Sequence, residues 1–315
     1  ELLFVPHQKR TVDYRRHDAV PDLSPADFLP RPPRPSIYQM NRHLLIAGHG
    51  YLGSEVARQA SGTGWHVTSL SRSGDDGTVP CDLSSPEQVA LLGSTISPPK
   101  SIIFTASSGR GGIQSYQSVF LDGSRHLLST FPDAQLIFSS STSVYHQTDG
   151  SLVTERSATE PTRETGLLLL EAESHILKAN GTVARLAGIY GPGRSAILRG
   201  LLEGSAVIEE DGRRFLNQIH RDDAASALLH LACHEGSRGN VYNVCDSSPL
   251  HQGDCYHALA DLFGRPVPTT GPRPENRKRA WTHKRVSNEK LRATGWEPSY
   301  SCFIDAAEAI AASLQ

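Results

Sequence analysis

The chain has 315 residues, enough for one large α/β domain or two modest ones, and its 31 Lys and Arg nearly balance its 33 Asp and Glu. This balance excludes a general electrostatic attraction for nucleic acid or for an anionic membrane, so any anion must bind at a local site. The five cysteines form no Cys-x-x-Cys pair, no apolar run approaches the roughly 20 residues that cross a bilayer, and no signal-peptide pattern is present, so we expect a cytoplasmic protein.

The first 39 residues differ from the rest of the chain. They contain seven prolines and almost no periodic apolar pattern, so they cannot build a core of their own. We predict a proline-rich, disordered extension at 1–39, with a partner-binding arm as the alternative. Met40, the only methionine, lies just before the first convincing strand, which indicates that the folded region begins there.

Between residues 43 and 188, short apolar runs alternate with helical segments. The runs have the composition of parallel strands buried on both faces, and we expect strands at 43–48, 66–70, 101–106, 134–140 and 182–188. The segments between them predict helices at 53–64, 85–95, 113–130 and 165–180. This alternation predicts an α/β fold, a Rossmann-type doubly wound parallel sheet.

Beyond residue 189 the alternation loosens. After the loosely patterned segment 196–204, the sequence predicts one more strand at 240–244 and helices at 221–235, 253–263 and 302–315. We expect a smaller C-terminal α/β region that caps the carboxyl ends of the sheet strands, where doubly wound folds bind ligands. The sheet domain is therefore assigned to 40–188, and a substrate-binding region interleaved with it to 189–315.

A glycine motif follows the first strand and opens the first helix. Gly48 suits a tight turn, Gly50 lets a pyrophosphate approach the backbone, and Gly53 lets helix and strand pack closely. The amides of Tyr51 and Leu52 are expected to point at the anion. The motif predicts dinucleotide binding by the sheet domain, and a glycine turn that serves packing alone is the alternative.

The end of the second strand distinguishes the two nicotinamide cofactors. An NAD-preferring fold places an acidic residue there to accept from the ribose 2′-hydroxyl, whereas this chain has Ser71 and Arg72. A serine and an arginine can donate to a 2′-phosphate. We therefore predict a preference for NADP(H), with NAD(H) as the second cofactor; an exposed loop arginine without this role is the alternative.

Further motifs follow the later strands, and together they resemble one family. These are "CDLSS", "FTASS", "FSSSTSVY", "RLAGIYGPGR", "IHRDDAASAL" and "KRVSNEKLRATGWEPSY". With the glycine loop, they make the chain from residue 41 to 315 similar to the extended short-chain dehydrogenase/reductase superfamily, the group of nucleotide-sugar epimerases and dehydratases, and especially to its atypical bacterial members. The resemblance implies an oxidoreductase or epimerase with a small-molecule substrate.

The resemblance also implies positions for the cofactor. Asp82 and Leu83 match the pair that meets the adenine ring, and Ala106 and Ser107 match the turn that passes under the ribose and pyrophosphate. Ser139 matches a residue that flanks the nicotinamide. Ser141 matches the catalytic serine, whose hydroxyl binds the oxygen that changes between alcohol and ketone.

The chain departs from the family at the proton-transfer pair. The family carries Tyr-x-x-x-Lys on a helix, where both side chains share one face. When Ser141 and Glu173 are matched to the family pattern, Thr165 takes the tyrosine position and Leu169 the lysine position. Neither side chain can replace a phenol and an ammonium in acid-base chemistry near neutral pH.

Three explanations remain open. Redox chemistry is retained with another proton donor, for which Tyr145, His146, Arg163 and Glu164 are the candidates nearest in sequence. Alternatively, the protein binds NADP(H) without turnover as a sensor or regulator, or it is a lyase or isomerase that uses the nucleotide structurally. Tyr145 is our first candidate, although a tyrosine here also fits a structural or substrate-contact role.

Other signals suggest weaker sites. Histidines and cysteines at 230–234 and 251–257 lack further ligands at a recognisable spacing, so we predict no metal. The basic run 273–285 is a solvated loop or a local anion site rather than a nucleic-acid surface. His220 and Asp223 belong to an element that we expect to tie the C-terminal region to the sheet. The segments 113–130 and 165–177 resemble the family's four-helix dimer contact, so a homodimer is one interpretation and plain core packing the other.

Overall fold

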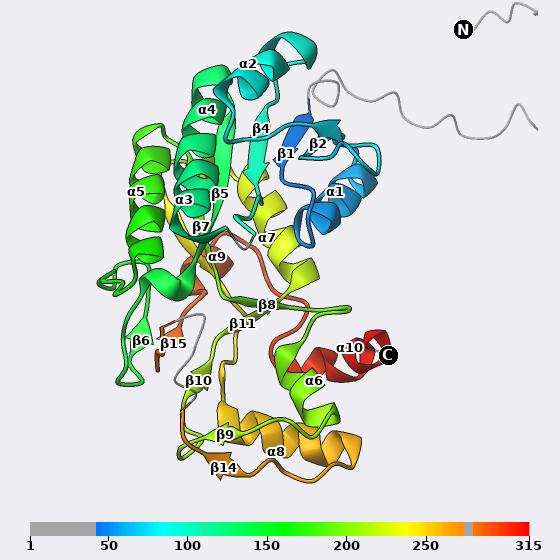
Figure 1. Cartoon of the computed structure of the whole chain (residues 1–315), viewed down its shortest axis with the longest axis vertical. Coiled ribbons are helices and arrows are strands. Elements are labelled where there is room, and N and C mark those ends of the chain that lie inside the picture. The colour runs from blue at the N-terminus through cyan, green and yellow to red at the C-terminus, as the bar shows by residue number, and fades with distance from the viewer. Residues whose placement is uncertain (1–41, 110, 274–279, 315) are drawn as a thin grey trace, which may run out of the picture.

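The computed structural model describes residues 42–109, 111–273 and 280–314, so the predicted extension at 1–39 lies outside the described residues. Its centre is a sheet of seven strands in the order β12-β7-β5-β4-β1-β2-β3, in which every neighbouring pair is parallel (Figure 1). This is the Rossmann-type sheet that the sequence predicts. Its strands are β1 (His43–Ala47), β2 (His66–Ser71), β3 (Val79–Pro80), β4 (Ser101–Phe104), β5 (Gln135–Ser141), β7 (Thr182–Leu186) and β12 (Val241–Val244).

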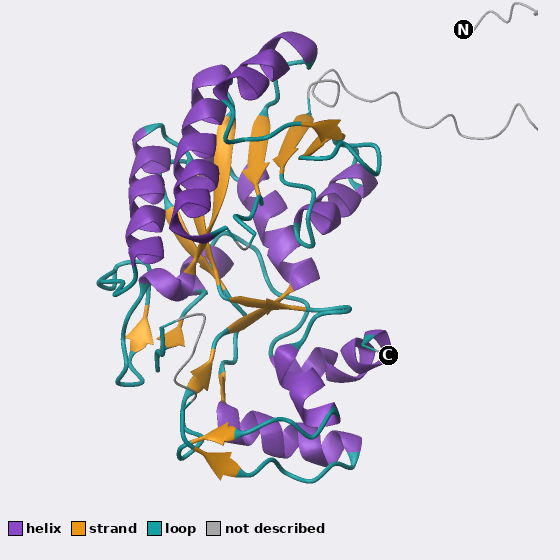
Figure 2. Cartoon of the chain, viewed as in Figure 1, coloured by secondary structure: helices purple, strands orange, loops and turns teal. Residues whose placement is uncertain are grey.

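Helices cover both faces of this sheet, as Figure 2 shows. One face packs on α1 (Gly53–Gly62) and α7 (Arg221–Cys233), and the other on α2 (Pro86–Thr95), α4 (Gly123–Thr130) and α5 (Glu164–Lys178). Because side chains alternate along a strand, Leu44 and Ile46 of β1 enter the first core and Leu45 and Ala47 the second. Full burial of each leucine or isoleucine contributes about 1.5–3 kcal/mol, which explains why these strands are almost continuously apolar.

The helix predicted at 113–130 is built from three segments. It consists of α3 (Gly112–Tyr116), a π-helical stretch (Gln117–Asp122) and α4. The π-helical stretch buries Phe120 and Leu121 against the sheet. Such widened turns often occur at functional sites, and here the stretch directly follows Tyr116.

The C-terminal region forms a smaller unit below the carboxyl ends of the sheet strands (Figure 1). A separate core gathers side chains such as Tyr190, Leu198, Leu259 and Phe303. Its elements are β8 (Gly188–Tyr190), α6 (Ala196–Leu202), β9 (Ile208–Glu209), β10 (Phe215–Leu216), β11 (Gln218–His220), β13 (Leu250–His251), α8 (Gln252–Phe263), β14 (Thr270–Gly271), a 3-10 turn (Phe303–Ala306) and α10 (Ala307–Ser313).

Two late elements return to the sheet domain and join the two units. The strand β12 pairs with β7, and α7 packs on α1. The carboxylate of Asp223 in α7 accepts hydrogen bonds from the backbone amides of Ser299 and Tyr300 at 2.9 and 3.0 Å. Asp223 thus ties the C-terminal segment to the sheet domain, while β6 (Leu152–Val153), β15 (Arg285–Val286) and α9 (Glu289–Arg292) complete the edge of the molecule.

Candidate active site

Glycine is required for different reasons at the three positions of the loop after β1. Gly48 has a φ of +114°, and a Cβ there would lie 2.4 Å from the backbone nitrogen of Ala106. A Cβ on Gly53 would lie 2.0 Å from the carbonyl oxygen of Gly48. A Cβ on Gly50 would meet nothing within 4 Å, and the residue is exposed. Protein packing therefore explains Gly48 and Gly53 but not Gly50.

A cavity of about 610 Å³ opens beside this loop. The helix α1 begins there at Gly53, and its N-cap residue Leu52 gives no side-chain cap. The amide of Ser54 donates to the carbonyl of Gly50 at 2.9 Å, so the amides that precede it are the ones available to an anion. Two buried polar atoms beside the loop and β5, Nδ1 of His49 and Oγ of Ser139, have no hydrogen-bond partner among the described residues. The open face of Gly50, the uncapped helix and Nδ1 of His49, which is on the cavity wall, fit a dinucleotide that runs along the loop, whereas Ser139 is not among the residues that line this cavity.

Most of the residues predicted to contact the cofactor line this cavity. The cavity wall includes Gly48, Gly50, Ser71, Arg72, Asp82, Leu83, Ala106 and Ser107. The side chain of Tyr51 instead turns to the C-terminal region, where its hydroxyl donates to the carbonyl of Pro192 at 3.1 Å. Leu52 and Gly53 lie in the first turn of α1, and the side chain of Leu52 is buried.

The turn after β2 gives Ser71 and Arg72 different tasks. The hydroxyl of Ser71 accepts from the amide of Gly74 at 2.9 Å and lies 2.6 Å from Oγ1 of Thr78, which itself donates to a backbone carbonyl. The hydroxyl hydrogen of Ser71 is therefore used in the bond to Thr78. In this arrangement Ser71 has no hydrogen left to donate to a phosphate, contrary to the prediction. Arg72 is exposed on the cavity wall. Hydrogen bonds from Ser84 lower the pKa of Asp82, and the charge of Arg72 adds to this.

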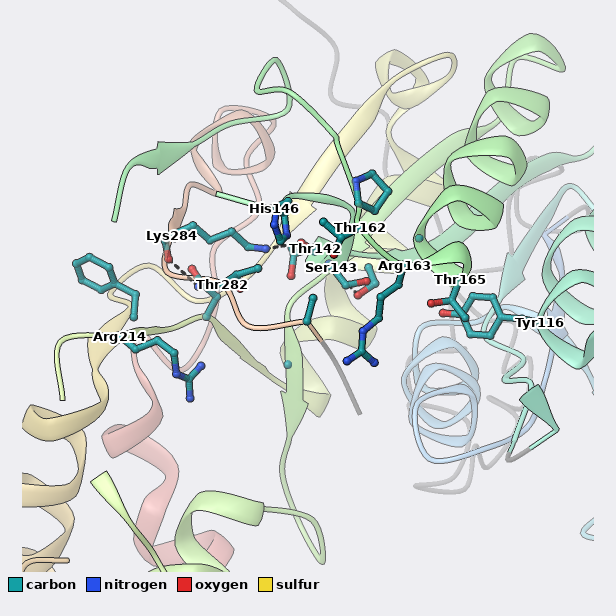
Figure 3. Close-up of a pocket in the computed structure, with 17 residues that line it drawn as sticks. Tyr116, Thr142, Ser143, His146, Thr162, Arg163, Thr165, Arg214, Thr282 and Lys284 are labelled. Atoms are coloured by element: carbon teal, nitrogen blue, oxygen red, sulfur yellow. Dashed lines mark hydrogen bonds between the residues drawn. The ribbon is translucent and has the colours of Figure 1, made fainter. Parts of the chain in front are cut away.

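A second cavity, of about 490 Å³, lies at the carboxyl end of β5 (Figure 3). Ser141, the last residue of β5, lines it, and its Oγ accepts from the amide of Ser143 at 3.2 Å. Thr165 lines it from the first turn of α5, and Tyr116 faces Thr165 from α3. The cavity therefore combines the predicted catalytic serine with the position at which the family carries its tyrosine.

The structure places the two residues of the altered pair in different environments. Thr165 is on the cavity wall, whereas Leu169, 2% exposed, lies in the apolar core beside α5. A lysine at 169 would have to enter that core, so the leucine is fully accommodated by the packing of the chain. No cation reaches the cavity from this position.

Tyr145, our first candidate for the proton donor, does not line the cavity. Its side chain is 0% exposed. Its hydroxyl donates to Oδ1 of Asn243 at 2.8 Å and accepts from Nη1 of Arg185 at 2.8 Å, and Arg185 is in turn paired with the buried Glu173. Burial raises the pKa of Tyr145, against the effect of Arg185. The catalytic role expected for Tyr145 is therefore not supported: the phenol is one member of a satisfied buried network.

The other candidates divide in the same way. His146 and Arg163 line the cavity, whereas Glu164 is an exposed residue that does not. The sequence reasoning missed Tyr116 and Lys284, which also line it. Tyr116 carries no local signal because it comes from a helix far earlier in the chain. Lys284 belongs to the basic run 273–285, for which the sequence predicts a solvated loop or a local anion site; residues 274–279 of that run lie outside the described residues.

Two histidines of the segments 230–234 and 251–257, for which we predict no metal, bond to other protein groups. Nε2 of His230 lies 2.8 Å from the hydroxyl of Thr294, and Nδ1 of His257 lies 2.8 Å from the carbonyl of Gly253. Within residues 42–109, 111–273 and 280–314, no three His, Cys, Asp or Glu side chains gather as metal ligands. Across the same residues, every helix is too short or too polar to cross a bilayer.

The sequence and the structure of this chain are similar to those of known proteins. A model of the NAD dependent epimerase/dehydratase family matches residues 44–245, more than half of the chain. Protein YeeZ of Escherichia coli K12 is 28% identical over 248 residues, covering 72% of this chain and 86% of YeeZ. A 2′-dehydrokanamycin reductase of Streptomyces kanamyceticus is 30% identical over 132 residues, 36% of this chain and 37% of the reductase. A solved structure from Methylobacillus flagellatus, assigned to the NAD-dependent epimerases/dehydratases, is similar with a TM-score of 0.71 at 27% identity, covering 87% of this chain and 98% of that one.

Proposed function

The chain belongs to the NAD dependent epimerase/dehydratase family, and from this membership we propose that it is an oxidoreductase that uses NADP(H) to reduce or oxidise a small carbonyl or sugar-type substrate. The nucleotide lies along the glycine loop, and the substrate lies in the cavity at the end of β5. The observation that carries the proposal is Ser141, which stands on the wall of that second cavity, at the end of the strand whose Ser139 leaves a buried hydroxyl without a partner. The similarity to a reductase over part of the chain supports the redox reading.

Each part of the site has a task in this proposal. The first turn of α1 and the face of Gly50 bind the pyrophosphate, and Arg72 binds the 2′-phosphate, which gives the preference for NADP(H) over NAD(H). A bound nicotinamide supplies the hydride chemistry. The hydroxyl of Ser141 donates to the substrate oxygen and fixes the carbonyl carbon for transfer.

A second candidate function is a sensor that binds NADP(H) without turnover. It is favoured by one specific observation: Thr165 and Leu169 stand where the family carries its tyrosine and lysine, and Leu169 is fully packed in the core. The two functions share the nucleotide site and differ only in the second cavity.

The test measures NADPH absorbance while a panel of aldehydes, ketones and keto sugars is added. We expect at least one compound to oxidise bound NADPH, and Ser141→Ala to slow this reaction at least tenfold while NADPH binding stays within twofold. Tight NADPH binding without oxidation by any compound would move the assignment to the sensor.

We also propose a cytoplasmic location, a small-molecule substrate rather than nucleic acid, and a homodimer. The dimer proposal is supported by α5, which packs beside α4 and carries the 58% exposed Leu167 on its outer side. Light scattering of the wild type and of Leu167→Glu tests it, because a charge at a dimer contact separates the protomers and a charge on a free surface does not.

A further inference from the structure

Lys284 is a buried lysine on the wall of the substrate cavity. Its side chain is 3% exposed and comes from the residue just before β15. Nζ donates to the carbonyl of Thr142 at 2.9 Å and to the carbonyl of Tyr145 at 2.5 Å, and Figure 3 shows the Lys284 side chain directed toward Thr142. Both carbonyls belong to the turn that directly follows Ser141. The same turn therefore presents the serine and anchors the ammonium.

Among the described residues of the cavity wall, no anion compensates this ammonium group. An ammonium has three N–H donors, and the two carbonyls accept two of them. The described residues that line the cavity include no Asp or Glu, and its other ionisable groups are Tyr116, His146, Arg163 and Arg214. The two carbonyls thus hold Nζ in place, but they can accept from the ammonium and from the neutral amine alike.

The acidic groups around Tyr145 have partners of their own: Glu173 pairs with Arg185, and Glu155 accepts from the amide of Asn243 at 2.8 Å. The centre of the Tyr145 ring lies 5.9 Å from Nζ of Lys284. The guanidinium of Arg185 packs on the same ring and is itself paired with Glu173. Along the chain, Lys284 is flanked by His283 and Arg285. Burial lowers the pKa of Lys284 to about 8. A proton donor is most effective when its pKa lies close to the working pH, which an ordinary lysine does not satisfy.

We propose that Lys284 replaces the missing tyrosine and lysine, and that its ammonium group donates the proton that the substrate oxygen takes up during reduction. This inference rests on the proposed redox function. Geometry carries it: the third N–H of Lys284 is the donor that remains after the two carbonyl bonds, and Lys284 shares the cavity wall with Ser141. Lysines with lowered pKa are used in this way because they exchange a proton near neutrality.

In the proposed step, a carbonyl group is reduced to an alcohol. The carbonyl carbon of the substrate accepts a hydride, two electrons and one proton, from the dihydronicotinamide of NADPH, and a C–H bond forms. The π electron pair of the carbonyl moves to oxygen, which takes one proton from Nζ of Lys284 and becomes a hydroxyl. The substrate is reduced, the nucleotide is oxidised to NADP⁺, and Lys284 is left as a neutral amine that regains a proton from water. Ser141 holds the oxygen during the transfer.

The first arm of the test uses three variants in the full chain. Lys284→Met keeps most of the apolar stem and removes the amine, whereas Lys284→Arg keeps the charge and the donors but cannot lose a proton at neutral pH. Lys290→Met is the matched control, because Lys290 is an exposed residue of α9 whose ammonium group donates hydrogen bonds to Asn240 and Val241, outside the cavity wall. NADPH affinity is measured first for each variant.

We expect NADPH to bind to all variants within twofold of the wild type, and kcat for carbonyl reduction to fall about 100-fold or more in both Lys284 variants. Lys290→Met should keep wild-type kcat. Wild-type kcat for reduction should fall as the pH rises through about 8, because the ammonium form is lost. Wild-type kcat in Lys284→Arg would overturn the proton donation and leave the redox function intact. If the wild type binds NADPH but reduces nothing, the redox function fails and this inference fails with it.

The second arm does not depend on turnover. The chain has six lysines, so labelling with ¹³C at Cε gives few resonances, and the one missing from Lys284→Met is assigned to Lys284. We expect it to titrate near pH 8. Should it titrate near the ordinary lysine value of about 10.4, the amine would stay charged throughout the working range and Lys284 would be only an anchor of the turn. If Lys284→Met does not fold, the comparison of wild type with Lys284→Arg decides the same question.

Discussion

Substitution of Gly50 separates nucleotide binding from folding. A Cβ at this position meets no protein atom within 4 Å, and its φ lies outside the left-handed region. Gly50→Ala should therefore leave the free energy of unfolding unchanged, or raise it by about 0.4–1 kcal/mol because the unfolded chain loses freedom. The methyl group would stand where the pyrophosphate must approach the backbone. We expect NADPH affinity to fall at least tenfold, which corresponds to about 1.4 kcal/mol.

The matched variant is Gly53→Ala, whose Cβ would lie 2.0 Å from the carbonyl oxygen of Gly48 and 2.7 Å from Oγ1 of Thr105. Overpacking of this kind costs about 1–3 kcal/mol or more, so this variant should lose stability. Urea unfolding and fluorescence titration with NADPH measure the two quantities on the same samples. Undiminished NADPH affinity in a stable Gly50→Ala would refute the placement of the nucleotide along the loop.

Four further outcomes follow from the structure. Arg72→Glu should weaken NADPH binding at least tenfold and change NADH binding by less than threefold, since a charge-assisted hydrogen bond contributes about 1.5–3 kcal/mol; paired titrations check this. Glu173→Ala leaves Arg185 buried without its partner and should cost about 3–5 kcal/mol in urea unfolding; a loss below 1 kcal/mol would contradict the buried pair. Asp223→Ala removes two hydrogen bonds from a buried carboxylate and should cost about 2–4 kcal/mol, measured in the same way. Burial lowers the pKa of Lys284 in the folded state to about 8, so the unfolded chain binds more protons than the folded one between about pH 8 and 10.4. As the pH rises through that range, the free energy of unfolding of the wild type should therefore increase by about 1–3 kcal/mol relative to that of Lys284→Met.

The sheet domain could be predicted from the sequence because its signals are local. Each strand is a short apolar run, and the glycines lie where a strand ends and a helix begins. The strand predicted at 43–48 is found at His43–Ala47, and the helix predicted at 165–180 at Glu164–Lys178. The altered positions Thr165 and Leu169 could also be identified, because the helix fixes their spacing from Glu173.

The second cavity could not be predicted, since its wall is assembled from distant segments. Tyr116 comes from α3 and Lys284 from the edge beside β15, and no local pattern brings them to Ser141. Nearness in sequence misled us at Tyr145: four residues after Ser141, the chain has already turned into the core. Ser71 illustrates a further limit, because its hydroxyl is used by a turn that only the folded backbone reveals.

The most direct test of the account is a titration of the wild type with NADPH and, separately, with NADH, followed by fluorescence. We expect one nucleotide per chain and at least tenfold tighter binding of NADPH than of NADH. Preference for NADH would contradict the assignment of Arg72 to the 2′-phosphate, and no binding of either nucleotide would contradict the nucleotide site itself.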